Sequence, residues 1–340
     1  MNWPESPTAY PLGDGRYAST IDQPNDRGAL IECVLQRSAE GSAIYPQGGR
    51  SALEYGGPPE RPGVALDVTG LNRVIDYPAA DMTITIEAGL SLHSLRQTLD
   101  AEGQRLPLEA PFADKATIGA IFATDTSGPR RFGHGRPRDQ IIGVAFVTSQ
   151  GGLVKGGGRV VKNVAGYDFP KLLTGSMGTL GPIVELTLKT RPKPESTAIV
   201  WSKWVGMDQL ELVLTALNTS QSRPVAIELM NQPAAESVML KSGDELPCGG
   251  PVLAVGVEGN SEVVSWQIGV LERELKGASD LLAIRDEKAE GLWEALTAHP
   301  AEEVVMTFKA SLLPSTVAAF IAAIDPGRWA IQSHAGNGVV

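Results

Sequence analysis

Twenty residues, from Ala116 to Gly135, constrain the fold of this chain more than any other stretch. They read A-T-I-G-A-I-F-A-T-D-T-S-G-P-R-R-F-G-H-G. The small residues let another group approach the backbone closely, and hydroxyls lie beside backbone N–H groups. The glycine spacing and the T-D-T-S-G-P turn interrupt any helical period, which predicts an irregular segment. Such a segment suits a large flat ligand with a diphosphate, although an irregular surface loop would look the same.

A second glycine-rich stretch, Tyr45–Ser51, reads Y-P-Q-G-G-R-S. We expect a short strand over residues 43–46 that leads into a turn, where backbone N–H groups can bind phosphate oxygens. The turn is not a Walker A loop, because no Gly-Lys-Ser/Thr follows, and it is not a G-x-G-x-x-G fingerprint. A plain hairpin turn is the alternative interpretation of Gly48-Gly49.

A third stretch runs from Lys162-Asn163-Val164-Ala165-Gly166-Tyr167-Asp168 to Gly175-Ser176-Met177-Gly178-Thr179-Leu180-Gly181. Glycines three residues apart predict irregular backbone that can approach a ligand closely. In this order and spacing, the three stretches resemble the FAD-binding domain of the vanillyl-alcohol oxidase/PCMH superfamily. Within it, residues 40–194 look most like the FAD-binding subunit of glycolate oxidase.

The resemblance implies an α+β fold. A PCMH-type FAD-binding domain of two α+β subdomains would occupy residues 25–194, after an N-terminal arm over residues 1–24. A plait-like (ferredoxin-like) α+β cap domain would occupy residues 195–340, with helices on one face of its sheet. The apolar end of the sequence, after a loop motif, leads us to expect a longer natural chain.

FAD is the cofactor that the resemblance implies, and it would contact residues of all three stretches. These residues are Pro46, Gln47, Gly48, Gly49, Arg50, Ser51, Pro111, Thr117, Ile118, Gly119, Ala120, Ala123, Thr124, Ser127, Gly128, Gly178, Gly181 and Ile183. Some superfamily members tether FAD covalently through a histidine in a Gly-Gly-His pattern. Arg50 stands at that position here, so we expect non-covalent FAD. Arg50 either pairs with a phosphate or is a surface arginine.

Composition excludes several classes of protein. The formal charge of −10 argues against a general nucleic-acid binder, which needs a basic face. The two cysteines, Cys33 and Cys248, cannot build a zinc site or an iron–sulfur cluster. The N-terminus shows no secretory signal, and the longest apolar run, residues 317–324, is too short to span a bilayer. These features predict a cytoplasmic protein, or one held at the inner face of the membrane through partners.

Periodicity and capping residues predict most elements. We expect strands at 64–68, 82–88 (half-buried), 141–148, 153–155 and 182–190, and helices after Asn25 or Asp26, at 91–102, and after Asp168 at 169–173. Arg191–Pro194 is the clearest linker. Beyond it we expect strands at 197–205, 225–230, 251–258, 304–310 and 329–334, and helices at 207–217, 261–275 and 314–324.

Two groups of side chains are candidates for chemistry. Arg130, Arg131, His134, Arg136 and Arg138 form a basic cluster in an acidic chain. The cluster either attracts a small carboxylate substrate, with Arg131 and His134 as binding residues, or is a solvated loop or partner contact. His334 begins H-A-G-N-G, which is similar to the His-x-Gly-Asp-Gly-Asn-x-His motif of related D-2-hydroxyacid dehydrogenases. Asn337 replaces the aspartate and the second histidine is missing, so we expect no metal.

The resemblance leads to three functional hypotheses. In the first, the chain is the flavoprotein subunit of a glycolate oxidase-type complex that oxidises glycolate or D-lactate, with His334 as base. Electrons would then pass to a paralogous flavoprotein subunit and an iron–sulfur subunit. In the second, the chain binds FAD for assembly or electron relay without catalysis. In the third, it is a stand-alone D-lactate-type dehydrogenase.

Overall fold

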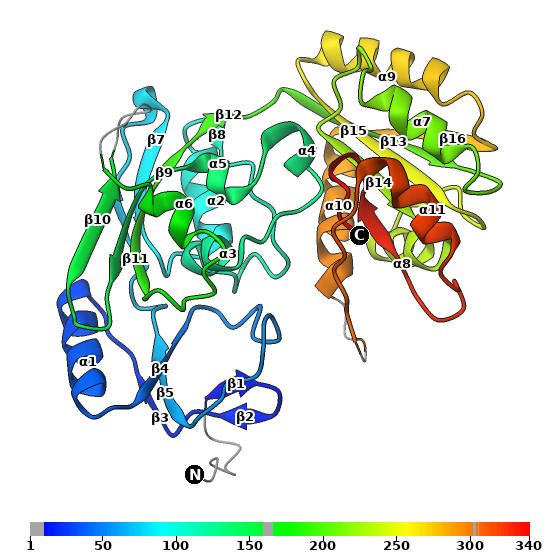
Figure 1. The fold of residues 1–340 in the computed structure, drawn as a ribbon. Helices are drawn as coiled ribbons and strands as arrows, with labels where there is room; N and C mark the ends of the chain where they lie inside the picture. Colours follow the sequence, from blue (N-terminus) through cyan, green and yellow to red (C-terminus); the bar gives the residue numbers. More distant parts are fainter. Residues whose placement is uncertain (1–9, 159–165, 302–303, 305) are drawn as a thin grey trace. The chain divides into compact units, whose positions relative to one another are not determined.

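The computed structural model describes residues 10–158, 166–301, 304 and 306–340, which form two compact units (Figure 1). Unit 1 runs to Ser127 and resumes over Arg136–Lys193, whereas unit 2 contains Gly128–Gly135 and Pro194–Val340. The chain therefore leaves unit 1 twice, and the second departure lies within the predicted linker. Lys162 and its neighbours up to residue 165 lie outside the described residues.

A three-stranded parallel sheet forms the smaller part of unit 1. Its strand order is β3-β5-β4, with β3 at Thr20–Asp22, β5 at Gly63–Asp67 and β4 at Ala43–Gln47. Helix α1 (Arg27–Ala39) packs Leu30 and Val34 against this sheet, and the Asp26 side chain accepts a hydrogen bond from Ala29 N at 2.9 Å. The predicted helix is confirmed, with Asp26 as its cap.

The N-terminal residues in the described part of the chain are more regular than predicted. Strands β1 (Pro11–Gly13) and β2 (Arg16–Tyr17) form an antiparallel pair, and β3 is an integral strand of the sheet. The prediction of an extended arm is therefore wrong for this part. The reason is that β3 obtains its hydrogen bonds from β5, about forty residues away, and local sequence carries no sign of that pairing.

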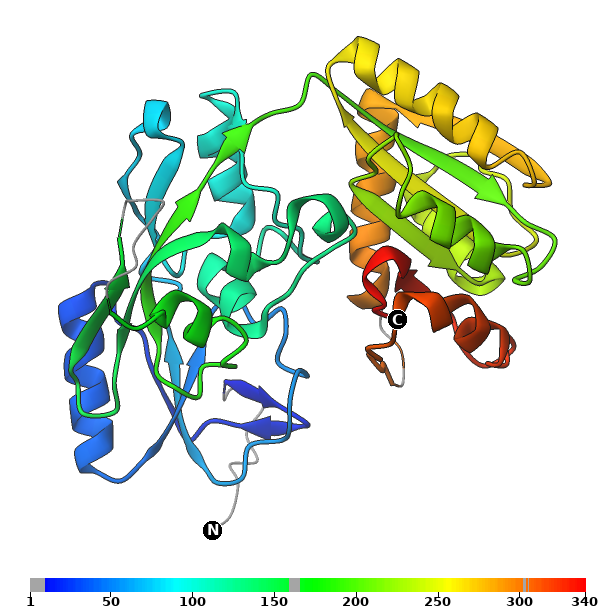
Figure 2. The ribbon, with the colours of Figure 1, turned by 45° about the horizontal axis from the view of Figure 1, so that its top comes forward.

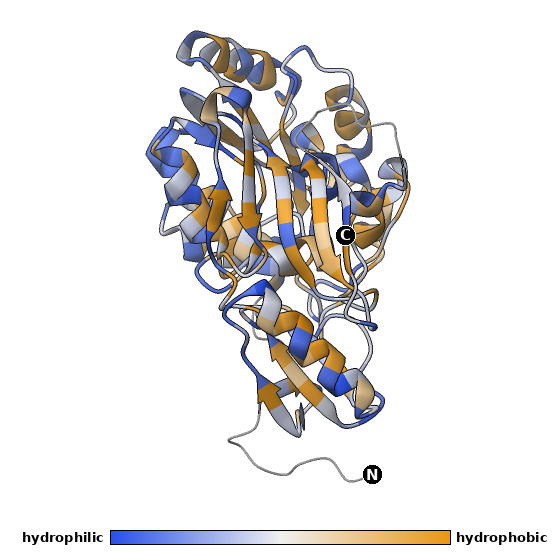
Figure 3. Cartoon of the chain, turned by 90° about the vertical axis from the view of Figure 1, so that its left-hand side faces the viewer, coloured by the Kyte–Doolittle hydropathy of each residue, from blue (hydrophilic) through white to orange (hydrophobic). Residues whose placement is uncertain are grey.

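A five-stranded antiparallel sheet forms the larger part of unit 1, in the order β10-β9-β11-β7-β6. The strands are β10 (Leu153–Gly157), β9 (Ile141–Val147), β11 (Ile183–Lys189), β7 (Thr83–Glu87) and β6 (Val74–Asp76). Hydrophobic and hydrophilic residues alternate along several strands (Figure 3). Helices α2 (Leu92–Asp100), α3 (Ile118–Thr124) and α6 (Phe169–Leu173) share one hydrophobic core with this sheet.

The predicted helix at α2 and the predicted cap of α6 are confirmed, but the burial predicted for β7 is wrong. Ser91 and Asp168 accept hydrogen bonds from Ser94 N and Lys171 N. All five residues of β7 are buried, including its polar ones. Thr85 bonds to Thr187 across the sheet, and Arg73 pairs with Glu87, so polar partners cover the face that was expected to be solvated. The remaining elements of unit 1 are η1 (Ala79–Asp81), α5 (Pro137–Gln140) and the paired strands β8 (Gln104–Arg105) and β12 (Arg191–Pro192).

Unit 2 is built on a five-stranded antiparallel sheet in the order β16-β13-β15-β14-β17. The strands are β16 (Asp280–Arg285), β13 (Ser196–Lys203), β15 (Val252–Gly259), β14 (Ala226–Met230) and β17 (Gln332–His334). Helices α7 (Leu210–Leu217) and α9 (Ser261–Glu274) lie on the same face (Figure 2). Together with β13, β14, β15 and β16 they follow the chain order of a plait-like fold.

Helices cover both faces of this sheet, so the prediction of helices on one face is wrong. α7, α9 and α11 (Val317–Ala322) share a core with Ala198 and Val200 of β13, whereas α8 (Gln232–Ser242) and α10 (Asp286–Ala298) share a second core with Ile199 and Trp201. Strand residues alternate between the two cores, which is why β13 is apolar throughout. Short pieces complete the unit: α4 (Arg131–His134), η2 (His299–Ala301), η3 (Pro314–Thr316) and η4 (Ala335–Asn337).

Sequence periodicity missed three elements of unit 2 and predicted one that is absent. β16, α8 and α10 were not expected. Residues 304 and 306–310 are not a strand, although apolar residues alternate there. Val304, Met306 and Phe308 are 57–66% exposed, so this alternation does not line a core. No helix in the described part of the chain is long and apolar enough to cross a membrane.

The packing of α10 gives a test of this fold. A Cβ at Gly256 of β15 would collide with the ring of Trp293, which is 2% exposed and donates a hydrogen bond to Thr197 Oγ1. We expect Gly256→Ala to lower the free energy of unfolding by about 1–3 kcal/mol. At Gly291, within α10, an added Cβ meets no atom within 4 Å. Gly291→Ala should therefore raise the free energy of unfolding by about 0.5–1 kcal/mol. Urea unfolding measures both, and a Gly256→Ala protein as stable as the parent would contradict the packing.

Candidate functional site

The first and second predicted cofactor stretches lie against each other in unit 1. The Gly48-Gly49 turn of the second stretch follows β4. It passes so close to the start of the first stretch that a side chain at either glycine would collide with the chain there. At Gly48 the obstacle is the Thr117 side chain, and at Gly49 it is the backbone carbonyl of Lys115. Both glycines are therefore required by the chain's own packing.

The third stretch joins the same place. Gly175 N and Met177 N donate to the carbonyls of Phe122 and Ala123, at 2.9 and 2.8 Å, beside the end of α3. Gly178 has a φ of +73°, and a Cβ there would lie 3.7 Å from Pro46. Three segments that are far apart in the sequence thus converge at the end of β4 and along α3.

The turn after β4 leaves a group of hydrogen-bond donors available. The backbone N–H groups of Gly48, Gly49, Arg50 and Ser51 donate to no described residue. Arg50 has left-handed backbone, with a φ of +58°. Successive N–H groups in a turn of this kind form a concave anion site. The turn therefore fits a diphosphate, and its path depends on the absence of a side chain at Gly49.

The segment that begins at Thr117 is a helix, which corrects the prediction of irregular backbone. Thr117 caps α3, and the first helical N–H groups, of Ile118 and Gly119, donate to the carbonyls of Leu90 and Ala88 at 2.9 and 2.7 Å. A Cβ at Gly119 would lie 2.8 Å from that of Ala88. The helix start is thus occupied by protein, and Gly119 serves helix packing rather than ligand approach.

The other predicted cofactor residues differ in accessibility. Pro111, Ala120, Ala123, Thr124 and Ser127 are half-buried in unit 1. By contrast, Ile118 and Ile183 belong to the hydrophobic core, at 0% and 6% exposure, and Gly181 lies against the Val147 carbonyl. Gln47 is buried and donates to Pro11 O at 2.8 Å. Gly128 is buried in unit 2.

The side chain of Arg50 has an aromatic partner within the described chain. Its guanidinium lies over the Tyr10 ring, 4.3 Å from the centroid. The Tyr10 hydroxyl in turn donates to Asp67, and burial raises the pKa of this phenol. The aromatic face holds the arginine beside the turn whose N–H groups are available.

Most of the basic cluster is neutralised within the protein. Arg130, whose side chain is 10% exposed, lies 2.7 Å from Glu258 and 3.3 Å from Glu290, with its guanidinium 4.0 Å from the Trp293 ring centroid. His134 Nε2 lies 2.9 Å from the same Glu258. These two side chains therefore anchor Gly128–Gly135 inside unit 2, which neither interpretation of the cluster anticipated.

The remaining arginines of the cluster have different surroundings. Burial lowers the pKa of Arg131, and the charge of Glu228 opposes that effect. Arg136 pairs with Asp125 in unit 1, and Arg138 is exposed. Of these three arginines, Arg131 is therefore the one whose burial lowers its pKa while a nearby carboxylate opposes the effect.

His334 lies on β17 and is held by Glu228 of β14. His334 Nδ1 is 2.7 Å from Glu228 Oε1, and Gln332 Nε2 donates to Glu228 Oε2 at 2.7 Å. Glu228 is 1% exposed, and the His334 side chain is 13% exposed. His334 Nε2 has no hydrogen-bond partner among the described residues. The ring is thus fixed through one nitrogen and available at the other.

Sequence reasoning missed the carboxylates Glu228 and Glu258 and the amide of Gln332. A signal for Glu228 was present, because it is the one charged residue within an apolar predicted strand, A-I-E-L-M. Gly336 of the H-A-G-N-G stretch packs against Phe132, whose ring a Cβ would strike. Within the described residues, no three His, Cys, Asp or Glu side chains are arranged to hold a metal ion.

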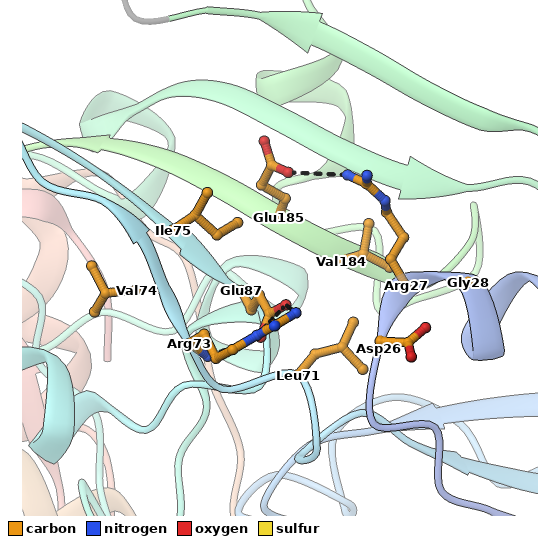
Figure 4. Close-up of a pocket in the computed structure, with 10 residues that line it drawn as sticks. All are labelled: Asp26, Arg27, Gly28, Leu71, Arg73, Val74, Ile75, Glu87, Val184 and Glu185. Carbon is orange, nitrogen blue, oxygen red and sulfur yellow. Dashed lines mark hydrogen bonds and ion pairs between the residues drawn. The ribbon is translucent and has the colours of Figure 1, made fainter.

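A pocket of about 570 Å³ in unit 1 lies away from the predicted cofactor residues (Figure 4). It lies beside the start of α1, and Leu71, Val74 and Val184 contribute apolar walls. Its charged side chains pair with each other, Arg27 with Glu185 at 3.4 Å and Arg73 with Glu87 at 2.7 Å. This internal pairing leaves little charge for a phosphate-bearing ligand, so the convergent loops remain the candidate cofactor site.

Part of the chain matches a known family. Residues 18–157 match the family described as FAD binding domain. The chain is 35% identical over 170 residues to glycolate oxidase subunit GlcE of Escherichia coli (strain K12), covering 50% of this chain and 48% of that protein. It is 32% identical over 210 residues to D-2-hydroxyglutarate dehydrogenase of Xanthomonas citri pv. viticola, covering 62% and 44%.

A solved structure of alkyldihydroxyacetonephosphate synthase shares the fold. The TM-score is 0.66 at 20% identity, over 84% of this chain and 57% of that one. The chain thus spans about half the length of the relatives that it matches. Residues 18–157 thus match an FAD binding domain, and 84% of the chain shares its fold with the synthase.

Proposed function

We propose that this chain uses FAD to oxidise a short 2-hydroxyacid to the corresponding 2-oxoacid. The observation that carries the proposal is the Glu228–His334 pair, since alcohol oxidation needs a base for the hydroxyl proton and this pair leaves one imidazole nitrogen available. The names of two relatives support the substrate class, because glycolate and 2-hydroxyglutarate are both 2-hydroxyacids.

Different residues of the chain bind FAD, bind the substrate carboxylate and take up the substrate proton. The N–H groups of Gly48–Ser51 bind the diphosphate of FAD, with Arg50 beside them, and no side chain tethers the flavin. When bound, FAD supplies the acceptor for the hydride that leaves the substrate carbon. His334 Nε2 takes the hydroxyl proton, and the half-buried Arg131 binds the substrate carboxylate. His134 is assigned to anchoring, because Glu258 already binds its Nε2.

Electrons leave the chain through partners in this proposal. The two cysteines cannot ligate an iron–sulfur cluster, so a paralogous flavoprotein subunit and an iron–sulfur subunit would receive them. A second candidate function is FAD-dependent assembly or electron relay without catalysis. The name of one relative as a subunit favours it, as does Asn337 at the aspartate position of the related motif.

The attachment of FAD is directly testable. Because Arg50 occupies the position of the tethering histidine, we expect acid precipitation of the yellow protein to release all flavin into the supernatant. The absorbance of both fractions measures this. Flavin that stays in the pellet would show a covalent bond and refute the assignment.

The turn after β4 is tested by Gly49→Ala. The new Cβ would collide with the Lys115 carbonyl, so the turn must move and its N–H groups lose their arrangement. We expect a folded protein, by circular dichroism, whose Kd for FAD rises at least about tenfold, equivalent to losing about 1.4 kcal/mol of binding. Gly57→Ala is the matched control, because a Cβ there meets nothing within 4 Å. An unchanged Kd for FAD in Gly49→Ala would place the diphosphate elsewhere.

The catalytic role is tested by His334→Asn in the flavin-loaded chain. Loss of a general base should lower kcat with glycolate or D-lactate and an artificial acceptor by about 10²-fold or more. The flavin content should be unchanged, since His334 belongs to unit 2 and the turn after β4 belongs to unit 1. Activity close to that of the parent chain would instead favour the assembly or relay function.

A further inference from the structure

We propose that Glu228 is a positioning residue that keeps the proton of the neutral His334 ring on Nδ1 and so keeps Nε2 free to accept the substrate proton. The inference rests on the proposed function, because it assigns the group that prepares the proposed base. It concerns two residues of unit 2 whose mutual geometry the structure shows directly.

The sheet itself sets this geometry. Glu228 of β14 and His334 of β17 are direct partners in the antiparallel register, so their side chains leave the sheet on the same face. The next pair on the same face, Met230 and Gln332, places the amide that binds the second oxygen of Glu228. Both carboxylate oxygens therefore have donors, at 2.7 Å each, and the side chain has one orientation.

The chemistry of the carboxylate then determines the tautomer. An ionised carboxylate accepts hydrogen bonds and donates none. The ring nitrogen that faces Glu228, Nδ1, must therefore carry hydrogen, and in the neutral ring Nε2 holds the lone pair. When Nε2 takes up a proton, the adjacent negative charge stabilises the imidazolium, as the aspartate of a serine protease triad does for its histidine.

The second histidine–glutamate pair of the unit uses the opposite ring nitrogen. Glu258 contacts His134 through Nε2 and also binds Arg130. Its geometry fits a structural anchor between a strand and a neighbouring segment. A glutamate beside a histidine in this unit therefore does not by itself contact the ring at Nδ1.

The location of Glu228 also argues for a specific role. It is 1% exposed and its neighbours Ile227 and Leu229 belong to the hydrophobic core. Burying a carboxylate costs free energy that an apolar residue of similar size would not, so stability alone does not account for it. The nearby charge of Arg131 and the donors on His334 and Gln332 offset part of that cost.

The protonation of His334 can be measured without turnover. Long-range ¹H–¹⁵N spectra of the full chain identify the protonated nitrogen of each histidine, and the sequence has four histidines, so His334→Asn assigns the signal. In the neutral ring of His334, we expect hydrogen on Nδ1 and a bare Nε2. In Glu228→Gln, the amide can turn its NH₂ group to the ring, so the share of Nε2–H should rise. A neutral parent ring protonated on Nε2 would overturn the inference.

A double-mutant cycle separates positioning from general structural support. We expect Glu228→Gln to lower kcat by roughly 10-fold or more, with KM changed by less than about threefold. In a His334→Asn background the same change should add no further loss, because Glu228 acts through the ring. Glu87→Gln, which alters a buried carboxylate of unit 1 that is paired with Arg73, is the control for folding and should leave kcat unchanged.

The outcomes separate the inference from the proposed function. A full additional loss of kcat from Glu228→Gln in the His334→Asn background would show a structural role and overturn the inference. Unchanged kcat in Glu228→Gln alone would overturn it while the function stands. If the flavin-loaded chain oxidises no 2-hydroxyacid, the proposed function fails, and the nitrogen spectra still decide whether Glu228 fixes the ring.

Discussion

The buried carboxylate of Glu258 holds a piece of the first half of the chain inside unit 2. It contacts Arg130 and His134, at 2.7 and 2.9 Å, and its own side chain is 4% exposed. Removing one member of such a buried pair leaves an uncompensated charge and costs about 3–5 kcal/mol. The anchored segment, Gly128–Gly135, is joined covalently to Ser127 before it and Arg136 after it. The path of the chain after α3 therefore depends on an interaction formed in another unit.

The glycines that identify the cofactor loops from sequence have two functions in the structure. Gly48 and Gly49 let the turn after β4 lie against the start of the first stretch, in a turn whose backbone N–H groups donate to no described residue. Gly119 and Gly336, by contrast, are explained by contacts with Ala88 and Phe132. A glycine pattern alone cannot distinguish close packing of protein against protein from close approach to a ligand, because both need the same absence of Cβ.

Sequence predicted those parts of the fold that depend on local information. Helix α1 has its apolar face within thirteen residues and its cap directly before them, β9 is a continuous apolar run, and β11 is rich in apolar residues. It failed where partners are distant: β3 depends on β5, and the helical start of α3 depends on carbonyls of residues 88 and 90. For the candidate site, the loops were predicted by resemblance, whereas the carboxylate that holds His334 is 106 residues away and becomes evident in the strand register.

One face of the unit 2 sheet combines anchoring with the chemistry that we propose. Glu228, Ala254 and Glu258 all point toward the side covered by α10, because alternate residues of antiparallel strands share a face. The two glutamates bind histidines through different ring nitrogens, Nδ1 for His334 and Nε2 for His134. Only a histidine held through Nδ1 in this way keeps Nε2 for a substrate. The choice of nitrogen, rather than the presence of a histidine, is therefore the feature that distinguishes a base from an anchor on this face.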